Sequence, residues 1–519
     1  MTEIELKLAI APAAVPALVR HPALLAVKRG RARTQKLVTL YFDTDDAMLA
    51  QAGVALRLRR AERHWLQSIK GATGAAGGGM SARPEYEWPV ARGEPDALRF
   101  AATPFRRVLG RAERKGLAPR FATEITRTVV PVAFADSTMA HLAIDRGVVR
   151  TADDGPRREA PICEIELELE AGDPLRLFEL AHALAADVPL AFEPASKAAR
   201  GFALRAPVTA APVRATDPEL THAMPAGAAF ATIILACVAQ IEGNAQGLVA
   251  SDDPEWIHQM RIGVRRLRAC LSLARKAFAA ARVEPLRAEL RWLAQALGAA
   301  RDLDVFTAQT LPLLRQSARA GSTHDLDDAL AALDRRARTR RDEARAHARA
   351  AVASPRFVRL VLAAAALAAA PAAERGDSRA HPNKLRKPAR AMAKRLQKRR
   401  HAALLALGHD LAHAAPEARH AARLAAKKLR YATEFFAPLF GRKRTRDYQK
   451  ALAALQEELG AWNDAAVAAR LASELAGPQS PAAAAFAGWA AAQGNERATA
   501  LADAWQRFVD ARPFWTAQH

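Results

Sequence analysis

Short segments in which charged and apolar side chains alternate recur throughout the first 205 residues. The segment EIELKL at 3–8 places Glu3, Glu5 and Lys7 on one side of the chain and three aliphatic side chains on the other. This period of two is typical of a β-strand, because successive side chains of a strand point to opposite faces. Later segments each carry mainly one sign of charge on the polar face: Arg57 and Arg59; Glu85 and Glu87; and Glu164, Glu166, Glu168 and Glu170.

Two arrangements satisfy this pattern. In the first, the strands form an ordinary antiparallel sheet whose charged face meets solvent. In the second, the sheet closes into a barrel with its charges turned inward and its apolar faces packed against covering helices. Such an interior is costly unless the charges find partners. Clustered carboxylates suit Mg²⁺ or Mn²⁺, and clustered Arg and Lys suit phosphate oxygens. The sorting of charge by strand suits the barrel, and with it a metal-dependent site for a linear phosphate chain, while the ordinary sheet remains the alternative on this pattern alone.

The chain divides into a strand-rich part and a helical part. Helical patterns near 97–110 and 174–186 interrupt the strands, which are predicted at 3–8, 54–60, 65–70, 85–88, 122–130, 139–145 and 163–170. Beyond a Pro-rich stretch without periodicity, the pattern becomes helical throughout. We therefore expect an α+β multidomain protein with a barrel domain at 1–205, a linker at 206–219 and an all-α domain at 220–519.

Residues 1–205 resemble the CYTH family, the triphosphate tunnel metalloenzymes. The segments that carry the resemblance are Glu3-x-Glu5-x-Lys7, YFDT at 41–44, LRLR at 56–59, Lys70, Glu85 with Glu87, CEIELE from 163 and SKAARG at 196–201. The family is known for a closed antiparallel eight-stranded β-barrel, the tunnel, with flanking helices. The resemblance implies hydrolysis of a triphosphate with Mg²⁺ or Mn²⁺ as cofactor.

The resemblance also implies roles for individual side chains. Glu3, Glu5 and Lys7 would be catalytic, and Lys7 would contact the phosphoryl group under attack. The implied metal ligands are Glu3, Glu5, Glu164 and Glu166. The implied substrate-binding residues are Arg57, Arg59, Lys70, Glu85, Glu87, Arg127, Lys197 and Arg200. Asp145 is a further candidate of the same kind as Glu85, and Glu168 and Glu170 can equally lie in solvent beyond the tunnel mouth. Ile125 stands where many members carry a lysine.

The helical part contains an internal repeat. The motif HQMRIGVRRLR at 258–268 aligns with HAARLAAKKLR at 420–430, and Asp302 aligns with Asp464 at the same offset along the chain. A fixed offset across separate motifs indicates two copies of one helical unit, at about 220–375 and 384–515. With about 100° per residue, the His and basic side chains of each motif fall on one stripe of a helix. We expect the two aspartates to cap helices or to form inter-helix salt bridges, with metal contacts as the alternative.

These motifs resemble those of the CHAD domain, a helical polyphosphate binder built from two four-helix bundles around a basic groove. The alternative is a pair of solvated helix faces. The resemblance implies that polyphosphate is bound by His258, Arg261, Arg265, Arg268, His420, Arg423, Lys427 and Arg430. The basic run KLRKPARAMAKRLQKRR at 384–400 would extend the groove or form a basic face like that of a nucleic-acid binder.

The charge balance agrees with a polyanionic partner. Of the net charge of +23, residues 206–519 contribute +18, with 47 basic and 29 acidic side chains. Three cysteines without metal or redox spacing, and an N-terminus without a signal-peptide pattern, predict a cytoplasmic location, with association with polyphosphate granules as a further expectation. No membrane partner is expected. Nucleic acid is disfavoured, because aromatic residues that stack on bases make up only 6% of the chain.

The function expected from these features is hydrolysis of inorganic triphosphate to diphosphate and phosphate, joined to polyphosphate binding by the helical domain. One alternative is a hydrolase of an organic triphosphate, such as thiamine triphosphate or a nucleoside triphosphate. Another is a non-catalytic protein that targets polyphosphate granules. The lack of a base-specific aromatic pattern favours the inorganic substrate, and the complete set of glutamates favours catalysis.

Overall fold

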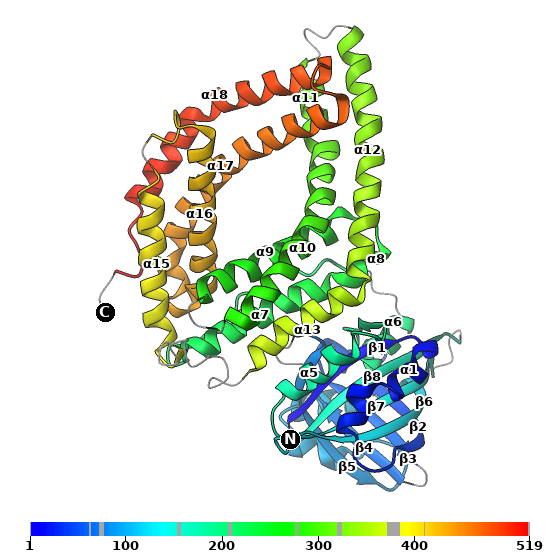
Figure 1. Ribbon diagram of the computed structural model, residues 1–519. Coiled ribbons are helices and arrows are strands. Elements are labelled where there is room, and N and C mark those ends of the chain that lie inside the picture. Colours follow the sequence, from blue (N-terminus) through cyan, green and yellow to red (C-terminus); the bar gives the residue numbers. More distant parts are fainter. Residues whose placement is uncertain are drawn as a thin grey trace. The chain divides into compact units, whose positions relative to one another are not determined.

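The computed structural model describes residues 2–61, 64–71, 77–152, 157–205, 210–275, 278, 280–318, 324–370, 385–408 and 410–516. It separates into two compact units (Figure 1). The barrel unit comprises Met1–Pro212, Ala245–Gly247 and Ala353–Ala369, and the helical unit comprises Val213–Asn244, Leu248–Val352 and Ala370–His519. Residues 206–209 of the predicted linker and residue 384 of the predicted basic run lie outside the described residues.

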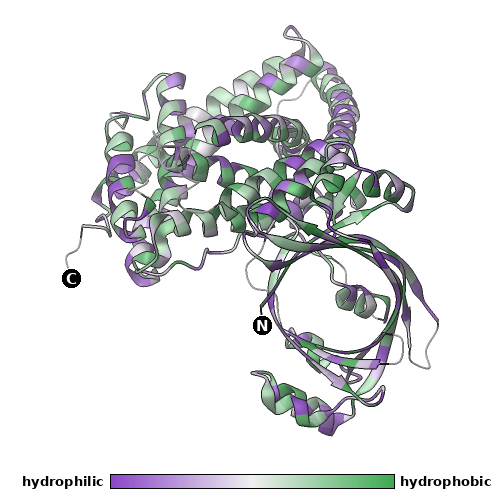
Figure 2. Ribbon diagram, turned by 60° about the horizontal axis from the view of Figure 1, so that its bottom comes forward, coloured by the Kyte–Doolittle hydropathy of each residue, from purple (hydrophilic) through white to green (hydrophobic). Residues whose placement is uncertain are grey.

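One antiparallel sheet forms the core of the barrel unit. Its strands are β1 (Thr2–Ile10), β2 (Arg33–Asp43), β3 (Ala55–Ala61), β4 (His64–Lys70), β5 (Met80–Val90), β6 (Ala118–Ala133), β7 (Met139–Thr151), β8 (Glu159–Ala171) and β9 (Leu190–Phe192). The strand order is β5-β4-β3-β2-β6-β7-β8-β1-β9, and pairing of β1 with β5 closes a ring of eight strands. Figure 2 shows this ring in a view near the barrel axis. The predicted closed eight-stranded barrel is confirmed.

The alternation in the sequence explains how the strands are oriented. On β1, Glu3, Glu5 and Lys7 line the interior, whereas Leu6 and Leu8 point outward and are fully buried under other elements. Full burial of one such leucine contributes about 1.5–3 kcal/mol. Each strand thus supplies apolar side chains to an outer core and polar side chains to the lumen.

Strand β2 was missing from the sequence prediction. Its inward side chains include Leu37, Thr39 and Tyr41, which are uncharged. The charge alternation that marks the other strands is therefore absent from β2. The short β9, which pairs with the end of β1, was also missing.

Helices cover the outside of the barrel. In the barrel unit they are η1 (Pro12–Ala14), α1 (Val15–Val19), α2 (Pro22–Val27), α3 (Met48–Gln51), η2 (Ala97–Ala102), α4 (Arg106–Lys115), α5 (Leu175–Leu184) and α13 (Pro355–Ala369). Helix α6 (Lys197–Arg205) instead lines the cavity inside the barrel. Helix α13 comes from the second half of the sequence and packs against α5 and β9. Its Phe357 ring lies edge-on to Phe192, with centroids 6.3 Å apart. Gly78, at φ +72°, lies so close to Ala365 and Phe178 that a Cβ would clash there.

The helical unit has the repeated architecture that the sequence predicts. Its elements are α7 (Ala226–Gly243), α8 (Ala245–Ala250), α9 (Pro254–Ala274), α10 (Ala280–Val305), η3 (Phe306–Thr310), α11 (Leu311–Ala318), α12 (His324–Val352), α15 (Ala389–Leu405), α16 (Pro416–Phe436), η4 (Ala437–Leu439), α17 (Arg442–Ala476) and α18 (Pro481–Asp510). Helices α9 and α16 begin and end at positions that the repeat in the sequence makes equivalent. The first copy is built on α7, α9, α10 and α12, and the second on α15, α16, α17 and α18.

The two copies join at both ends. Where α7 and α15 begin, the backbone N–H of Ala226 donates to Lys387 O and that of Ala389 donates to Met224 O, each at 2.9 Å. At the far end, α12 packs against α17 and α18. A shared apolar core there includes Phe306 of the first copy and Phe486 of the second. The copies therefore form one folded unit.

One stretch of the helical part has the length and hydropathy of a membrane span. It covers Ala226–Ala250, with a mean hydropathy of 1.6, and 56% of that window is buried inside the protein. The polar side chains of Gln240 and Asn244 are buried in it and hydrogen-bonded, as in the core helix of a folded bundle.

Candidate active site and anion-binding site

All eight strands of the ring and α6 line a cavity of about 730 Å³ inside the barrel. Its charged lining consists of Glu3, Glu5, Lys7, Arg57, Arg59, Lys70, Arg83, Glu85, Glu87, Arg127, Asp145, Glu166, Glu168 and Lys197. Its apolar wall includes Leu37, Tyr41, Ile125 and Phe202. The lumen is therefore a highly charged chamber with one apolar side.

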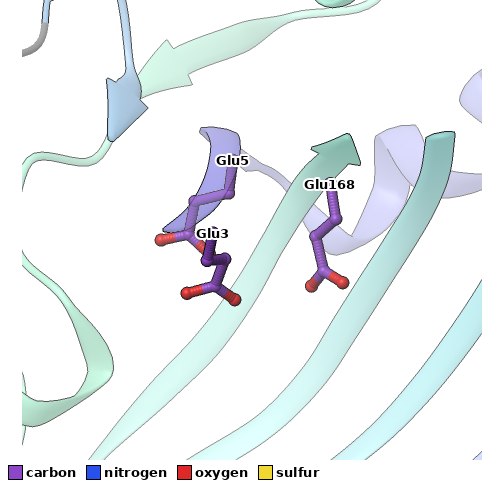
Figure 3. A group of neighbouring side chains, drawn as sticks. All are labelled: Glu3, Glu5 and Glu168. Atoms are coloured by element: carbon purple, nitrogen blue, oxygen red, sulfur yellow. The ribbon is translucent and has the colours of Figure 1, made fainter. Parts of the chain in front are cut away.

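Glu3, Glu5 and Glu168 form the first carboxylate cluster (Figure 3). One oxygen from each lies within 4.8 Å of the others. The pairing of β1 with β8 sets Glu5 opposite Glu168, and Glu3 lies two residues earlier on the same face. Burial raises the pKa of Glu168 to about 7, although Arg127 acts in the opposite direction.

Three cations flank this cluster, each closest to a different carboxylate: Lys70 Nζ lies 2.6 Å from Glu3 Oε2, Arg83 donates a hydrogen bond to Glu5, and Arg127 Nη1 lies 3.0 Å from Glu168 Oε1. Among the described residues, no single cation contacts all three carboxylates.

Asp145, Glu164 and Glu166 form the second carboxylate cluster, and all three are buried. Lys197 Nζ lies 2.7 Å from Asp145 Oδ2, 2.5 Å from Glu164 Oε1 and 2.7 Å from Glu166 Oε1. Burial acts to lower the pKa of Lys197, but the three carboxylates together raise it well above its usual value. An ammonium group of the chain itself thus already occupies the centre of the second cluster, and Arg127 pairs with Asp145 and Glu166 as well.

The two clusters differ in how well they fit a divalent cation. Both offer only carboxylate oxygens, the donors that Mg²⁺ and Mn²⁺ prefer. Arg83 approaches both Glu5 and Glu3, and Lys70 and Arg127 each approach one member of the first cluster. Lys197, in contrast, already contacts all three members of the second. Both oxygens of Glu164 are nevertheless buried without an aligned hydrogen bond in the described part of the chain. Glu3, Glu5 and Glu168 are therefore the residues that fit a metal, and an ion at the second cluster would have to displace Lys197.

Arg57, Arg59 and Lys70 face the same part of the cavity. Arg57 Nη2 donates to Glu85 Oε1 at 3.0 Å, and Lys70 Nζ lies 3.0 Å from Glu85 Oε2. Arg59 forms no ion pair with a described carboxylate, and its Nε is buried without a hydrogen-bond partner. The neighbouring charge of Arg57, together with burial, lowers the pKa of Arg59. Arg59 is therefore a buried cation that a bound anion would satisfy.

Lys7 and Arg200 lie at different distances from the cavity. Lys7 lines it and donates a hydrogen bond to the carbonyl oxygen of Ala195. Burial lowers the pKa of Lys7. Arg200 is absent from the lining, and its Nη1 lies 3.6 Å from Glu164 Oε2. Arg200 therefore contacts the Glu164 carboxylate from outside the cavity lining.

In the helical unit, α9 and α16 bring two basic stripes to one cavity of about 290 Å³. Helix α9 contributes His258, Arg261 and Arg265, and α16 contributes Arg423 and Lys427. We call this the twin-stripe cavity. The repeat in the sequence therefore places equivalent basic side chains around one space.

Salt bridges to the next helix hold each stripe in place. Arg261 Nη1 lies 2.7 Å from Asp302 Oδ1, and Arg423 Nη2 lies 3.9 Å from Asp464 Oδ1. The inter-helix salt bridges predicted for these aspartates are confirmed. The cavity still has more basic than acidic side chains. Burial, reinforced by Arg423 and Arg265, lowers the pKa of Lys427 to about 8.

Two family models match the chain. Residues 1–202 match the CYTH domain, and residues 232–473 match the CHAD domain. The chain is a CYTH–CHAD protein.

Individual proteins resemble parts of this CYTH–CHAD chain. An inorganic triphosphatase from Haemophilus influenzae is 31% identical over 206 residues, which are 39% of this chain and 55% of that protein. The chain thus spans about half the length of this curated relative. A crystal structure of the CHAD domain from the plant Ricinus communis is 34% identical, covers 58% of this chain and 98% of its own, and has a TM-score of 0.48. A putative adenylyl cyclase from Hippeastrum, described as having a dominant triphosphatase activity, is 20% identical, covers 39% of this chain and 95% of its own, and has a TM-score of 0.28.

In the CYTH domain the structure gathers nearly all the predicted site residues in one cavity, with two differences. Arg200 lies behind the lining, and the predicted metal set is divided between the two carboxylate clusters. The strand register explains the division, because Glu168 faces Glu5 across the β1–β8 ladder whereas Glu164 faces Ala9. Glu168 therefore lies inside the cavity, while Glu170 is half exposed and pairs with His141 at 3.4 Å.

One charged residue of the CYTH cavity was missed. Arg83 on β5 contacts Glu5 and lies 3.6 Å from Glu3. Its spacing of two and four residues from Glu85 and Glu87 places it on the same strand face. That periodicity was the signal available in the sequence.

In the CHAD domain three of the predicted stripe residues lie away from the twin-stripe cavity. Arg268 is exposed, Arg430 pairs with Glu434 at 2.5 Å, and His420 lines a neighbouring cavity. A stripe of ten residues extends about 15 Å along a helix, more than so small a cavity can face. Arg301 on α10 lines the twin-stripe cavity and was not predicted.

Proposed function

We propose that the CYTH domain hydrolyses inorganic triphosphate to diphosphate and phosphate. The observation that carries the proposal is the convergence, in one cavity, of three carboxylates suited to a hard divalent cation and of buried cations suited to phosphate oxygens. The similarity to a protein named inorganic triphosphatase supports the same reaction.

Glu3, Glu5 and Glu168 would hold Mg²⁺ or Mn²⁺, which would neutralise phosphate oxygens and lower the pKa of a bound water. The chain's own cations supply the rest of the site. Arg59, which has no carboxylate partner in the described residues, would bind phosphate directly. Arg57 would exchange part of its contact with Glu85 for phosphate oxygens.

Lys7, Arg127 and Lys197 complete the proposed site. Lys7 would donate a hydrogen bond to the phosphoryl group under attack, since it lies between the two carboxylate clusters on β1. Arg127 and Lys197 would stabilise charge that passes to the leaving diphosphate. Because these donors are already fixed by carboxylates, little reorganisation is needed when charge develops.

A substrate panel with the full chain tests this proposal. We expect phosphate release to be fastest with inorganic triphosphate, compared with thiamine triphosphate, ATP and long-chain polyphosphate, and to stop when EDTA removes the metal. Glu3→Gln should lower kcat at least a hundredfold. Glu124→Gln, which removes a half-exposed carboxylate from the outer face of β6, should leave it unchanged.

Other outcomes would redirect the proposal. Turnover of an organic triphosphate alone would assign the apolar wall of Leu37, Tyr41, Ile125 and Phe202 to an organic group. Tight binding of triphosphate without turnover by any metal-loaded form would identify a non-catalytic sensor, such as a protein that targets polyphosphate granules.

We propose in addition that the CHAD domain binds long-chain polyphosphate, which would place the protein in the cytoplasm beside polyphosphate granules. The supporting observation is the twin-stripe cavity, where basic side chains of both repeats meet with few acidic partners. Arg265→Gln should weaken binding to long-chain polyphosphate, and affinity should fall steeply with salt because condensed counterions are released. Arg470→Gln, at an exposed position of α17, is the control. Equal affinity for duplex DNA of the same charge, insensitive to Arg265→Gln, would leave only diffuse electrostatic attraction.

A further inference from the structure

A second cavity of about 950 Å³ adjoins the twin-stripe cavity within the helical unit. It lies among α16, α17, α18 and the loop before α16, and we call it the Trp462 cavity. Arg423 and Asn463 line both cavities, so the two spaces share a wall. His420, the repeat equivalent of His258, faces the Trp462 cavity and not the twin-stripe cavity. The second basic stripe therefore serves two cavities, while the first serves one.

The repeat shows that this cavity is specific to the second copy. Its two main side chains are Arg419 and Trp462. At the equivalent positions of the repeat, the first copy carries Ile257 and Ala300, which are 5% and 0% exposed. Two buried apolar residues of the first copy are thus replaced in the second copy by a cation and an indole ring that line a cavity.

Arg419 and Trp462 form a rigid anion-binding element. The guanidinium carbon of Arg419 lies 3.7 Å from the centroid of the Trp462 ring. Stacking of this kind holds the guanidinium plane and leaves its edges as hydrogen-bond donors. One donor reaches the carbonyl oxygen of Ala412 at 3.3 Å. No carboxylate of the described residues forms an ion pair with Arg419.

Glycine at position 494 makes room for the indole. A Cβ built at Gly494 on α18 would lie 3.1 Å from the Trp462 ring. The ring is therefore held between α18 and the Arg419 side chain. Glu417, which is exposed, is the one acidic side chain in the lining described for this cavity.

We infer that the Trp462 cavity is a second phosphate subsite, which takes the continuation of a long inorganic polyphosphate chain whose other part lies in the twin-stripe cavity. The inference rests on the proposed polyphosphate binding by the CHAD domain. Arg423 at the shared wall would contact the chain where it passes from one cavity to the other. Arg419 would bind the oxygens beyond that point through its planar fork, and His420 would lie beside them. A short chain fills the twin-stripe cavity alone, so only a long chain would reach Arg419.

The experiment compares two chain lengths on the full protein. Tripolyphosphate and long-chain polyphosphate are titrated by calorimetry, over a series of salt concentrations, against a parent protein and its Arg419→Gln variant. Both proteins carry Glu3→Gln, and EDTA is present, so that no phosphate is released; both also carry Arg57→Glu and Arg59→Glu, which remove phosphate binding inside the barrel. For the long chain, Arg419→Gln should cost about tenfold in affinity, the usual contribution of one charge-assisted hydrogen bond, and should reduce the salt slope by about one. For tripolyphosphate it should cost nothing. Arg419→Lys should recover the charge but only part of the affinity, because the planar fork is lost.

Two controls separate this inference from the function on which it rests. Arg470→Gln should leave both titrations unchanged, and Arg265→Gln should weaken both. If Arg265→Gln weakens long-chain binding and Arg419→Gln does not, the second subsite is refuted and polyphosphate binding stands. If neither variant changes the affinity, the proposed function of the CHAD domain fails. Equal losses for both chain lengths in Arg419→Gln would show that Arg419 supports the fold of the twin-stripe cavity and would refute the subsite. Trp462→Phe keeps an aromatic face against Arg419 and is a second test of the subsite. It should also weaken binding of the long chain and not of tripolyphosphate, with a smaller loss of affinity than Arg419→Gln.

Discussion

Raising the pH through 8 should weaken polyphosphate binding by the CHAD domain, and replacing Lys427 should remove that dependence. The pKa of Lys427 is lowered to about 8, because burial and the neighbouring charges of Arg423 and Arg265 disfavour its charged form. A bound polyanion supplies the missing counter-charge, so the pKa in the complex returns toward the ordinary value of 10.5. At pH values between about 8 and 10.5, binding of polyphosphate is therefore accompanied by uptake of a proton by Lys427.

The magnitude follows from the two pKa values. In the free protein, Lys427 is protonated in about nine molecules of ten at pH 7 and about one of ten at pH 9. The complex stays protonated throughout, so affinity should fall about tenfold between these pH values, equivalent to about 1.4 kcal/mol. Because the side chain is partly exposed, screening by solvent reduces the expected loss to between about threefold and tenfold.

Other titratable groups at this site keep one state over that range. Burial lowers the pKa of His258, so its ring is neutral at pH 7 and above. Burial raises the pKa of Tyr431, which hydrogen-bonds Arg265, so its hydroxyl keeps its proton. Among these residues, the change of charge between pH 7 and pH 9 belongs to Lys427.

Anisotropy titrations with labelled long-chain polyphosphate at pH 7, 8 and 9 and constant ionic strength measure the effect. Lys427→Arg should bind with similar affinity at all three values, since a guanidinium keeps its charge. Lys427→Met should bind weakly throughout. It should also be more stable by about 1 kcal/mol at pH 7, because the fold disfavours the charged amine and partial exposure limits the gain. A wild-type affinity that is constant from pH 7 to 9, or a loss that persists in Lys427→Met, would refute the reasoning.

Three further perturbations test the packing of both units. Lys197→Met should lower the unfolding free energy by about 3–5 kcal/mol, because three buried carboxylates lose the ammonium that contacts all of them. Mn²⁺ should raise the melting temperature of this variant more than that of the wild type. Unchanged stability of the variant without metal would contradict the role given to the ammonium. Gly201→Ala should destabilise by about 1–3 kcal/mol, since its Cβ would lie 2.1 Å from a buried aromatic ring. Gly110→Ala, whose Cβ would meet Arg114 Nη1 at an ordinary contact distance of 3.7 Å, should stabilise by about 0.5–1 kcal/mol in thermal unfolding. Limited proteolysis of the linker should cut before Val213, whose backbone is hydrogen-bonded to Asn244 in both directions at 3.0 and 2.9 Å; a first cut beyond that point would place the boundary elsewhere.

The charges sorted by strand suggested a closed barrel, and the CYTH motifs decided between that barrel and an open sheet. A strand with glutamates or arginines at every second position identifies its own inward face, and several such strands imply a common interior. The register between neighbouring strands cannot be read from the charge pattern in the sequence. Whether Glu164 or Glu168 meets Glu5 depends on the alignment of β1 with β8, which turns and bulges decide.

Contacts made by helices were also beyond prediction. Lys197 was expected to bind phosphate, yet in the structure its ammonium lies between Asp145 of β7 and two glutamates of β8. In the helical unit the constant offset between the two motifs predicted that the two basic stripes are equivalent. It could not show that substitutions such as Ala300 to Trp462 make the surroundings of the two stripes different.

Helix α13 is synthesised long after the strands of the barrel against which it packs. The strands and α6 are complete once Arg205 has been made, but α13 is complete only at Ala369, after most of the first helical copy. At about 5–20 residues per second, a ribosome needs roughly 8–30 s to cover that distance. During this interval the face of α5 that α13 will cover, with Phe178 at 1% exposure in the finished protein, has no partner on the nascent chain. We therefore expect chaperones that bind apolar surface to engage the newly made barrel on the ribosome, and a message truncated before codon 355 to yield a barrel that aggregates.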